Sequence, residues 1–288
     1  MPHRRRGTTF REALRRQIGD HGVEQGKAIL GDAQPAAGVD RDRAFVLQKR
    51  DAARIEVARF LGRAERSCAL FVRINPIGSA ESDEDLDAIL SAVPDGIVLP
   101  KAEGARSVDD LRHRLRGHRM PVLPIATETP AAVFRLGDYA PVAEHLAGLT
   151  WGAEDLPAAI GAAASRDETG AYLPPYQVAR ALTLFGAAAA GVRPIETVYP
   201  DFRDLEGLKR IAQAAARDGF TGMMAIHPMQ VPVINAAFTP SPEAVAHARA
   251  VVAAFDANPH AGALQLDGRM IDAPHLKQAR RILERAEP

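Results

Sequence analysis

Short apolar runs alternate with longer amphipathic stretches from about Ala69 onward. Six runs are apolar at successive positions, as strands buried on both faces of a parallel sheet are: Ala69–Ile74, Gly96–Leu99, Pro121–Ala126, His145–Thr150, Arg193–Val198 and Gly222–Ile226. The intervening pattern predicts helices over Asp83–Ser91, Ser107–Leu115, Pro130–Leu136, Pro175–Gly186 and Leu205–Arg217, with Ser82 and Ser107 as caps of the first two. Strand and helix in strict alternation predict an α/β fold made of right-handed βα units.

Polar residues gather just after the predicted strands, which bears on the choice between an open sheet and a barrel. They are Arg73, Asn75, Lys101, Glu103, Glu128, Glu154 and Asp155. No glycine-rich nucleotide-binding turn follows any of these strands. Because a barrel carries its chemistry at the carboxyl ends of several strands, we expect a (β/α)8 TIM-type barrel.

The two ends of the chain differ from this repeat. Pro240–Pro288 predicts a C-terminal helical extension, with helices Glu243–Asp256 and Pro274–Ala286 around a short apolar stretch, Ala263–Leu266. The first two barrel strands are poorly supported, because only Lys27–Leu30 and Ala44–Leu47 could supply them. The expected organisation is an atypical segment 1–48, a barrel 49–239 and an extension 240–288.

The amino-acid composition limits the classes of partner that we expect. The 288 residues carry 36 basic and 36 acidic side chains, so a generic polyanion binder is not expected, and neither is nucleic acid as a partner. No apolar run reaches the roughly 18 residues of a membrane span, and Cys68 is the single cysteine. We therefore expect a cytoplasmic protein with no membrane partner and no internal disulfide.

Two carboxylates are the first candidates for chemistry. Glu128 and Asp155 each follow an apolar strand, so in a parallel barrel both face the same mouth and could hold Mg²⁺. The alternative is that they cap the helices that follow them. Arg73 stands at the end of a predicted strand and could bind a carboxylate or phosphate, or else form an internal ion pair.

Three further residues have two interpretations each. Lys101 could form a Schiff base or a structural ion pair. His227 could be an acid, a base or a ligand, or a loop residue without a chemical role. Asp272, directly before the last predicted helix, is by position an N-cap candidate.

Several segments occur together in a characteristic order. They read FVRINPIGSAESDEDLDAIL (71–90), GIVLPKAE (96–103), LPIATETP (123–130), LTWGAEDL (149–156), VYPDFRD (198–204), AIHPMQV (225–231) and GRMIDAPHLKQARRIL (268–283). In this combination the chain resembles the citrate lyase β-subunit-like family, which includes malyl-CoA and citramalyl-CoA lyases. The resemblance covers the chain from about Lys49 to its end.

The resemblance implies a (β/α)8 barrel that forms a homotrimer or homohexamer, with Mg²⁺ as cofactor and an acyl-CoA and a small 2-oxoacid as partners. Glu128 and Asp155 match the Mg²⁺ ligands of the family. Arg73 matches the arginine that binds the oxoacid carboxylate and takes part in catalysis.

Further roles come from the same resemblance. Gly152 and Ala153 are expected to bind substrate, since they stand in the motif that carries Asp155. Asp272 matches a catalytic acid/base delivered by an adjacent subunit. The implied reaction is the reversible, Mg²⁺-dependent cleavage of a malyl-CoA or citramalyl-CoA type thioester into acetyl-CoA and a 2-oxoacid. Two alternatives stay open: an impaired paralogue that only binds CoA thioesters, and a citrate lyase β subunit acting on a carrier-bound citryl thioester.

The chain departs from the family pattern near its start. Residues 38–54 read GVDRDRAFVLQKRDAAR, where the family has an apolar strand followed by an acidic motif. Three explanations are a misread frame or start site, divergence, and completion of the barrel by another chain. The abrupt onset of agreement at Lys49–Arg54 favours the first.

Overall fold

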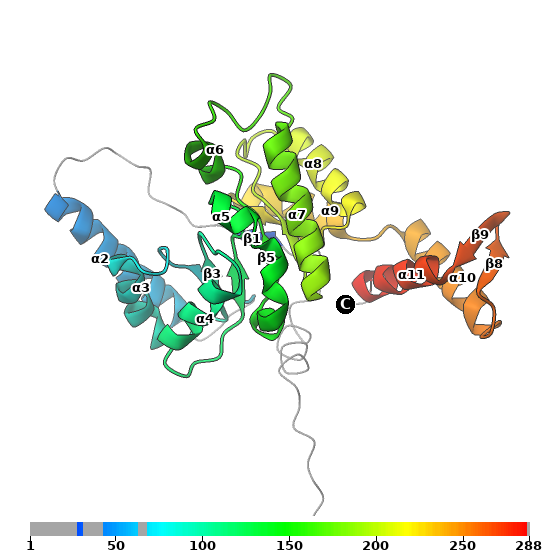
Figure 1. Cartoon of the computed structure of the whole chain (residues 1–288), viewed down its shortest axis with the longest axis horizontal. Coiled ribbons are helices and arrows are strands. Elements are labelled where there is room, and N and C mark those ends of the chain that lie inside the picture. The colour runs from blue at the N-terminus through cyan, green and yellow to red at the C-terminus, as the bar shows by residue number, and fades with distance from the viewer. Residues whose placement is uncertain (1–27, 31–42, 63–67, 287–288) are drawn as a thin grey trace, which may run out of the picture.

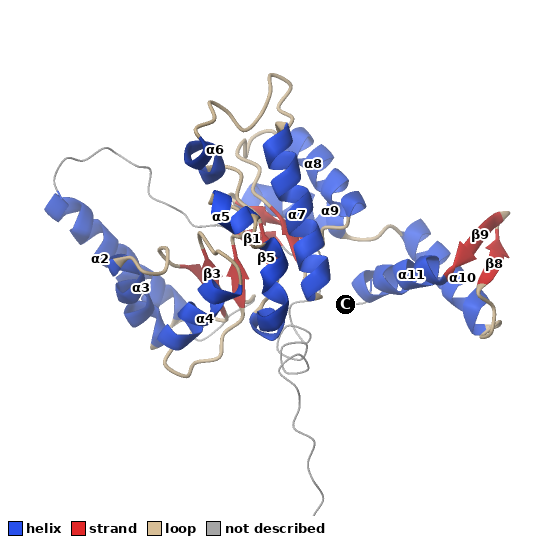
Figure 2. Ribbon diagram, viewed as in Figure 1, coloured by secondary structure: helices blue, strands red, loops and turns tan. Residues whose placement is uncertain are grey.

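Two parallel sheets, joined edge to edge, form the centre of the protein (Figures 1 and 2). The computed structural model describes residues 28–30, 43–62 and 68–286. The first sheet has the order β2-β3-β4, with β2 at Phe71–Arg73, β3 at Gly96–Leu99 and β4 at Val122–Pro124. The second has the order β1-β7-β6-β5, with β1 at Ala28–Leu30, β7 at Gly222–Ala225, β6 at Pro194–Glu196 and β5 at Leu149–Thr150. A parallel bridge between Ile125 and Thr150 joins them.

The joined sheets curve around a common interior. Side chains from β3, β4, β6 and β7 meet in one buried cluster, made of Val98, Leu123, Ile125, Ile195 and Met224, with Phe71 of β2 packed against it. Such convergence is typical of a barrel. Within the described residues, however, no strand lies between β1 and β2, and the expected closed barrel is not formed. The β2 edge shows this: its residues are half-buried or exposed, whereas β3 and β7 are buried throughout.

Helices surround this sheet, with α2 packed against α3. They are α2 (Arg43–Leu61), α3 (Ala80–Leu90), α4 (Ala105–Arg114), α5 (Pro130–Val133), α6 (Asp155–Ile160), α7 (Pro174–Ala190), α8 (Leu205–Asp218) and α9 (Val231–Phe238), with 3-10 turns η1 (Leu136–His145) and η2 (Pro228–Gln230). The packing follows helical periodicity: α8 buries Leu208, Ala212 and Ala215 on one face and ends at Gly219 in the left-handed region.

The six strands predicted after Ala69 are confirmed, most of them shorter than predicted. The caps were wrong: Ser79 caps α3 by accepting from the Ser82 amide, and Ser107 lies inside α4, which follows Gly104. Of the two N-terminal candidates, Ala28–Leu30 is a strand paired with β7. Ala44–Leu47 lies within α2 instead, because no turn residue separates it from the helix-forming sequence that follows. Residues 38–42 of the atypical stretch lie outside the described residues.

The C-terminal part is a small unit with its own core. It comprises α10 (Pro242–Asp256), an antiparallel hairpin of β8 (Ala263–Leu266) and β9 (Arg269–Asp272), and α11 (Ala273–Ala286). Its core contains Ala248, Val251, Phe255, Ile271 and Ala279. The two predicted helices are confirmed, and the apolar stretch Ala263–Leu266 between them is the first strand of a hairpin that the prediction did not name. Asp267 and Gly268 both have positive φ at its turn, as a tight two-residue hairpin requires.

Figure 1 shows this unit projecting from the rest of the molecule beyond α9. Arg285 of α11 donates to the carbonyl of Phe238 at 2.8 Å, which ties the unit to the end of α9. The boundaries 1–48, 49–239 and 240–288 stay a prediction. In the ranges that the structure describes, no helix combines the length and the apolar content needed to cross a bilayer.

Candidate functional site

Four charged side chains follow the carboxyl ends of four neighbouring strands. Arg73 ends β2, and Lys101, Glu128 and Asp155 stand in the turns after β3, β4 and β5. Because the strands are parallel and adjacent, these ends lie on one rim. The charges of Arg73, Asp155 and Lys101 all act on the pKa of Glu128, so the rim brings the four together.

Glu128 is the most enclosed of the four. It is 7% exposed, and burial is the largest influence on its pKa, which is raised above the ordinary value. The Lys101 backbone N–H donates to Glu128 Oε2 at 2.6 Å and opposes this shift. Glu128 does not cap α5, since the cap is Thr129, whose hydroxyl accepts from the Ala132 amide. The carboxylate is therefore aimed at the rim and not at a helix end.

The turn that presents the Lys101 N–H is held in an uncommon conformation. Lys101 has φ of +50°, in the left-handed region. The buried hydroxyl of Tyr139 fixes the next residues, accepting from the Gly104 amide and donating to the Ala102 carbonyl, both at 3.2 Å. The Lys101 ammonium lies 3.9 Å from Asp155 Oδ2. Of the two interpretations of Lys101, the structure shows the ion pair.

Asp155 opens α6 without capping it. The N-cap is Glu154, which makes no capping hydrogen bond through its side chain. The Asp155 side chain is 47% exposed and faces the Lys101 ammonium. Neither Glu128 nor Asp155 thus performs the capping role that was the alternative to metal binding.

Gly152 lets the β5–α6 turn approach Glu128 closely. A Cβ at this position would lie 2.7 Å from Glu128 Cγ, inside any real contact distance. The Gly152 N–H donates to Thr127 Oγ1 at 2.9 Å, and the same hydroxyl donates to the Gly152 carbonyl at 3.0 Å. Ala153 is 1% exposed and packs in the adjacent core. The substrate contacts expected of Gly152 and Ala153 stay predictions.

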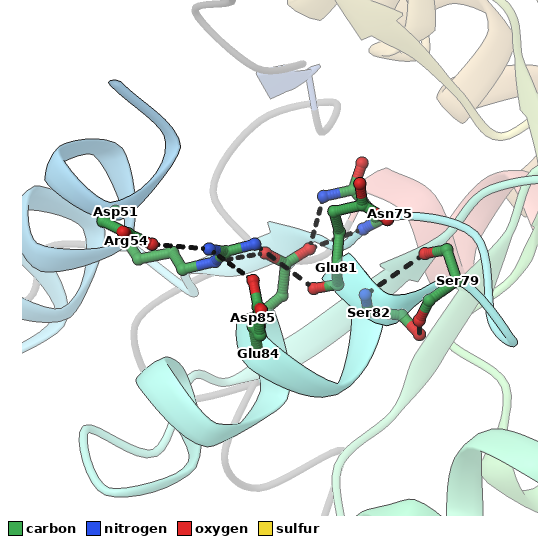
Figure 3. A network of polar contacts seen from close by, with 8 residues as sticks. All are labelled: Asp51, Arg54, Asn75, Ser79, Glu81, Ser82, Glu84 and Asp85. Carbon is green, nitrogen blue, oxygen red and sulfur yellow. Dashed lines mark hydrogen bonds and ion pairs between the residues drawn. The ribbon is translucent and has the colours of Figure 1, made fainter. Parts of the chain in front are cut away.

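Arg73 is exposed at the end of β2, and the chain just beyond it is anchored (Figure 3). Asn75 donates its backbone N–H and its side-chain amide to Asp85 Oδ2, at 2.8 and 2.7 Å. Arg54 of α2 donates to Asp85 Oδ1 at 2.9 Å. Among the described residues no ion pair of Arg73 is formed, and its charge acts on Glu128 across the rim. The binding of an anionic ligand by Arg73 stays a prediction.

Asp272 is not brought to this rim within one chain. It ends β9 in the C-terminal unit, and Figure 1 shows that hairpin apart from β5 and α6. His275 Nδ1 lies 2.5 Å from Asp272 Oδ1, which pairs the two side chains. His227 caps η2 by accepting from the Met229 amide and stacks on Phe202, so it behaves as a loop residue.

Several residues that shape the rim were not found from the sequence. They are Thr127, Tyr139 and Glu196. A charged residue within an apolar run was the available signal for Glu196, in RPIETV. The others carried none, since their partners are distant in the chain.

The donor set of the rim fits a hard divalent cation. Two carboxylates meet there, and in the described part of the chain no three histidine, cysteine or acidic side chains gather in a metal-binding group. Mg²⁺ is bound through one or two protein carboxylates, with water and substrate oxygens completing its shell. Glu128 and Asp155 are the residues that could hold it.

Comparisons with known proteins point to one family. The profile of the HpcH/HpaI aldolase/citrate lyase family matches residues 39–228. A citrate lyase subunit beta-like protein of Mycobacterium tuberculosis is 37% identical over 215 residues, which are 75% of each chain. The mitochondrial citramalyl-CoA lyase of Homo sapiens is 31% identical over 271 residues, covering 84% of this chain and 76% of the human protein.

The structural comparison leads to the same proteins. The crystal structure of CitE from M. tuberculosis in complex with magnesium, acetoacetate and coenzyme A has a TM-score of 0.70 and 32% identity, covering 91% of this chain and 90% of that one. A citrate lyase β subunit from the same organism, complexed with oxaloacetate and magnesium, has a TM-score of 0.56 and 32% identity over 69% of this chain and 82% of that one. The expectation of a carbon–carbon lyase is confirmed, and the chain belongs to the HpcH/HpaI aldolase/citrate lyase family.

Proposed function

We propose that this protein is a Mg²⁺-dependent lyase that cleaves a malyl-CoA or citramalyl-CoA type thioester into acetyl-CoA and a 2-oxoacid, reversibly. The observation that carries the proposal is the pair Glu128 and Asp155, whose charges interact on one rim beside Arg73. Relatives named citramalyl-CoA lyase and solved relatives with magnesium, coenzyme A and small oxoacids support it. The proposed scaffold is a (β/α)8-type barrel.

Each residue of the rim has a distinct task in this proposal. Glu128 and Asp155 would hold Mg²⁺, which lowers the pKa of a bound hydroxyl and stabilises the oxygen of the oxoacid. Arg73 binds and orients the carboxylate of the oxoacid portion through its fork of N–H donors. The Lys101 N–H fixes one oxygen of Glu128 and thereby the orientation of this carboxylate.

The bond changes balance without a further reactant. The substrate hydroxyl gives its proton to solvent water, the bond between its carbon and the carbon beside the thioester breaks, and the electron pair passes to the acetyl-CoA enolate. The enolate then takes a proton at that carbon. We assign this proton transfer to Asp272 of an adjacent subunit in a homotrimer or homohexamer, with His275 holding its carboxyl group in place.

The first test measures product release. Glyoxylate from malyl-CoA and pyruvate from citramalyl-CoA are followed with and without Mg²⁺, with citryl-CoA and a carrier-bound citryl thioester as comparison substrates. Glu128→Ala and Asp155→Ala should each lower kcat/KM by about 100-fold or more, because a ligand to the cation is lost. Glu154→Ala, the neighbouring acid without a capping bond, is the matched control and should stay near wild type. Undiminished release by both ligand variants contradicts the proposal.

The second test concerns the subunit that supplies Asp272. Asp272→Ala and Glu128→Ala chains should each be inactive alone. When they are coexpressed, mixed oligomers contain sites with an intact rim and an intact Asp272 from different chains, so activity should return. No recovery in mixed oligomers, shown by mass spectrometry to have formed, contradicts delivery between subunits.

A further inference from the structure

A buried carboxylate stands behind the β5–α6 turn and has no place in the chemistry proposed above. Glu196, at the end of β6, is 1% exposed. Its Oε1 accepts from Trp151 Nε1 at 2.5 Å and from the Thr197 amide at 2.9 Å, and its Oε2 accepts from Arg180 Nε at 2.6 Å. Both oxygens are thus engaged inside the protein, so this carboxylate is not placed to bind a cation or move a proton.

The ion pair of Glu196 is itself braced. Arg180 of α7 also donates to Asp218 Oδ2 at 2.7 Å, at the end of α8. Its guanidinium lies over the ring of Phe220, 4.7 Å from the ring centre. The position of Glu196 is therefore set by α7, by the end of α8 and by its own strand.

Trp151 connects this ion pair to the rim. It directly follows β5 and is 1% exposed, and Tyr172 packs edge-on against it with ring centres 5.0 Å apart. The next residue is Gly152, whose backbone exchanges two hydrogen bonds with Thr127. The β5–α6 turn is thus held by two contacts, one between the Trp151 indole and Glu196 and one between the Gly152 backbone and the Thr127 hydroxyl.

Stability alone does not account for such an arrangement. Burying an ion pair removes both charges from water, and an apolar pair of similar size often stabilises a protein equally well or better. A carboxylate also orients its partners, because its two oxygens hold the indole N–H and the guanidinium at set distances.

We propose that Glu196, held by Arg180, is a positioning residue that fixes Trp151 and thereby sets Gly152 and Asp155 against Glu128. This inference rests on the proposed function, in which the β5–α6 turn supplies the Mg²⁺ ligand Asp155. Replacing a residue that orients a metal ligand typically weakens metal binding. We expect a loss of about tenfold in Mg²⁺ affinity when Glu196 is replaced.

The test uses the single tryptophan of the chain as its probe. Glu196→Gln keeps the volume of the side chain but removes the charge that pairs with Arg180. Its Trp151 emission should move to longer wavelength and be quenched more by acrylamide, and calorimetry with Mg²⁺ should show binding weakened about tenfold. The matched control is Thr183→Ala, a buried change on the same helix that removes a hydrogen bond to the Ala179 carbonyl and leaves the Glu196 contacts in place. It should lower the melting temperature and leave emission and Mg²⁺ binding unchanged.

The double variant Glu196→Gln/Arg180→Met separates stability from positioning and replaces the single variant if that does not fold. It leaves no unpaired buried charge, so its stability should recover while Mg²⁺ binding stays weak. Wild-type emission and Mg²⁺ affinity in a folded Glu196→Gln or double variant overturn the positioning role. A wild-type protein that binds Mg²⁺ but cleaves no thioester contradicts the proposed function instead, and the comparison of affinities remains decisive for Glu196.

Discussion

Gly152→Ala tests the rim with the smallest possible change. The new methyl carbon would stand 2.7 Å from Glu128 Cγ and 3.1 Å from Ile125 Cγ2. Ordinary contact begins near 3.4 Å, so Glu128 must retreat by roughly 0.7 Å or the turn must move by as much. Glu128 is buried and tied to the Lys101 N–H, and its Cγ is not a freely moving chain end.

The displacement is large on the scale that metal binding tolerates. Ligand distances in a functional metal site hold to within about 0.2 Å, and a misplacement of about 1 Å near the reacting groups can cost on the order of 100-fold in rate. We expect Mg²⁺ affinity to fall about tenfold or more and kcat/KM about 100-fold. Unfolding should be easier by about 1–3 kcal/mol, as for other overpacked sites.

Gly137→Ala is the control, because a methyl group there meets nothing within 4 Å. Both variants and the wild type are compared by Mg²⁺ calorimetry, by thioester cleavage and by urea unfolding. Wild-type Mg²⁺ binding and turnover in Gly152→Ala would refute the reasoning, since the cation could then not depend on where Glu128 lies beside this turn.

Three further variants test local contacts, two of them beside the rim and one at the start of α8. Tyr139→Phe leaves the Gly104 amide and the Ala102 carbonyl without their shared partner, so urea unfolding should show a loss of about 1–3 kcal/mol, and calorimetry weaker Mg²⁺ binding through the displaced Lys101 turn. Arg54→Met removes the charged donor to Asp85 and should lower stability by about 2 kcal/mol and raise KM for the thioester; an unchanged KM would show that the chain after Arg73 holds its place without α2. Hydrogen bonds from Tyr199 and from the Gly207 amide hold the pKa of Asp204 below its ordinary value, so this carboxylate stabilises the fold at pH above its unfolded pKa and loses that effect as pH falls through the lower folded value. The melting temperature of Asp204→Ala should therefore lie below that of the wild type at pH 7, and the two should converge in acid.

The strands and the rim could be predicted because both depend on local pattern. β3 begins and ends as predicted, since GIVL is apolar at every position and bounded by Asp95 and Pro100. Glu128 and Asp155 were recognisable because polar residues directly follow apolar runs, and parallel pairing brings such positions together.

What stayed hidden depends on contacts between distant positions. The left-handed conformation of Lys101 is stabilised by Glu128, 27 positions along the chain, and Trp151 finds Glu196 45 positions away. The β8–β9 hairpin was missed because its apolar positions, such as Leu264 and Ile271, read equally well as part of a helical extension. Alternation alone does not tell a short strand from a turn between helices.

The free edge of β2 and the departure from the family pattern at residues 38–54 both concern the N-terminal part of the chain. β2 is half-buried because no described strand covers its free edge, and β1 lies at the other end of the sheet order. Residues 31–42, between Leu30 at the end of β1 and Arg43 at the start of α2, lie outside the described residues.

The resemblance implies a second strand near this interval. A misread frame upstream of about Lys49 stays a hypothesis, since the family profile already matches from residue 39, within the stretch that departs from the motif pattern. The gene and its transcript, sequenced across codons 1–50, should then show a second frame that encodes an apolar strand followed by acidic residues. An intact frame matching the present residues would exclude the misreading. The free edge that β2 has within the described residues would then need cover, from the rest of the chain or from another chain, to prevent edge-to-edge aggregation.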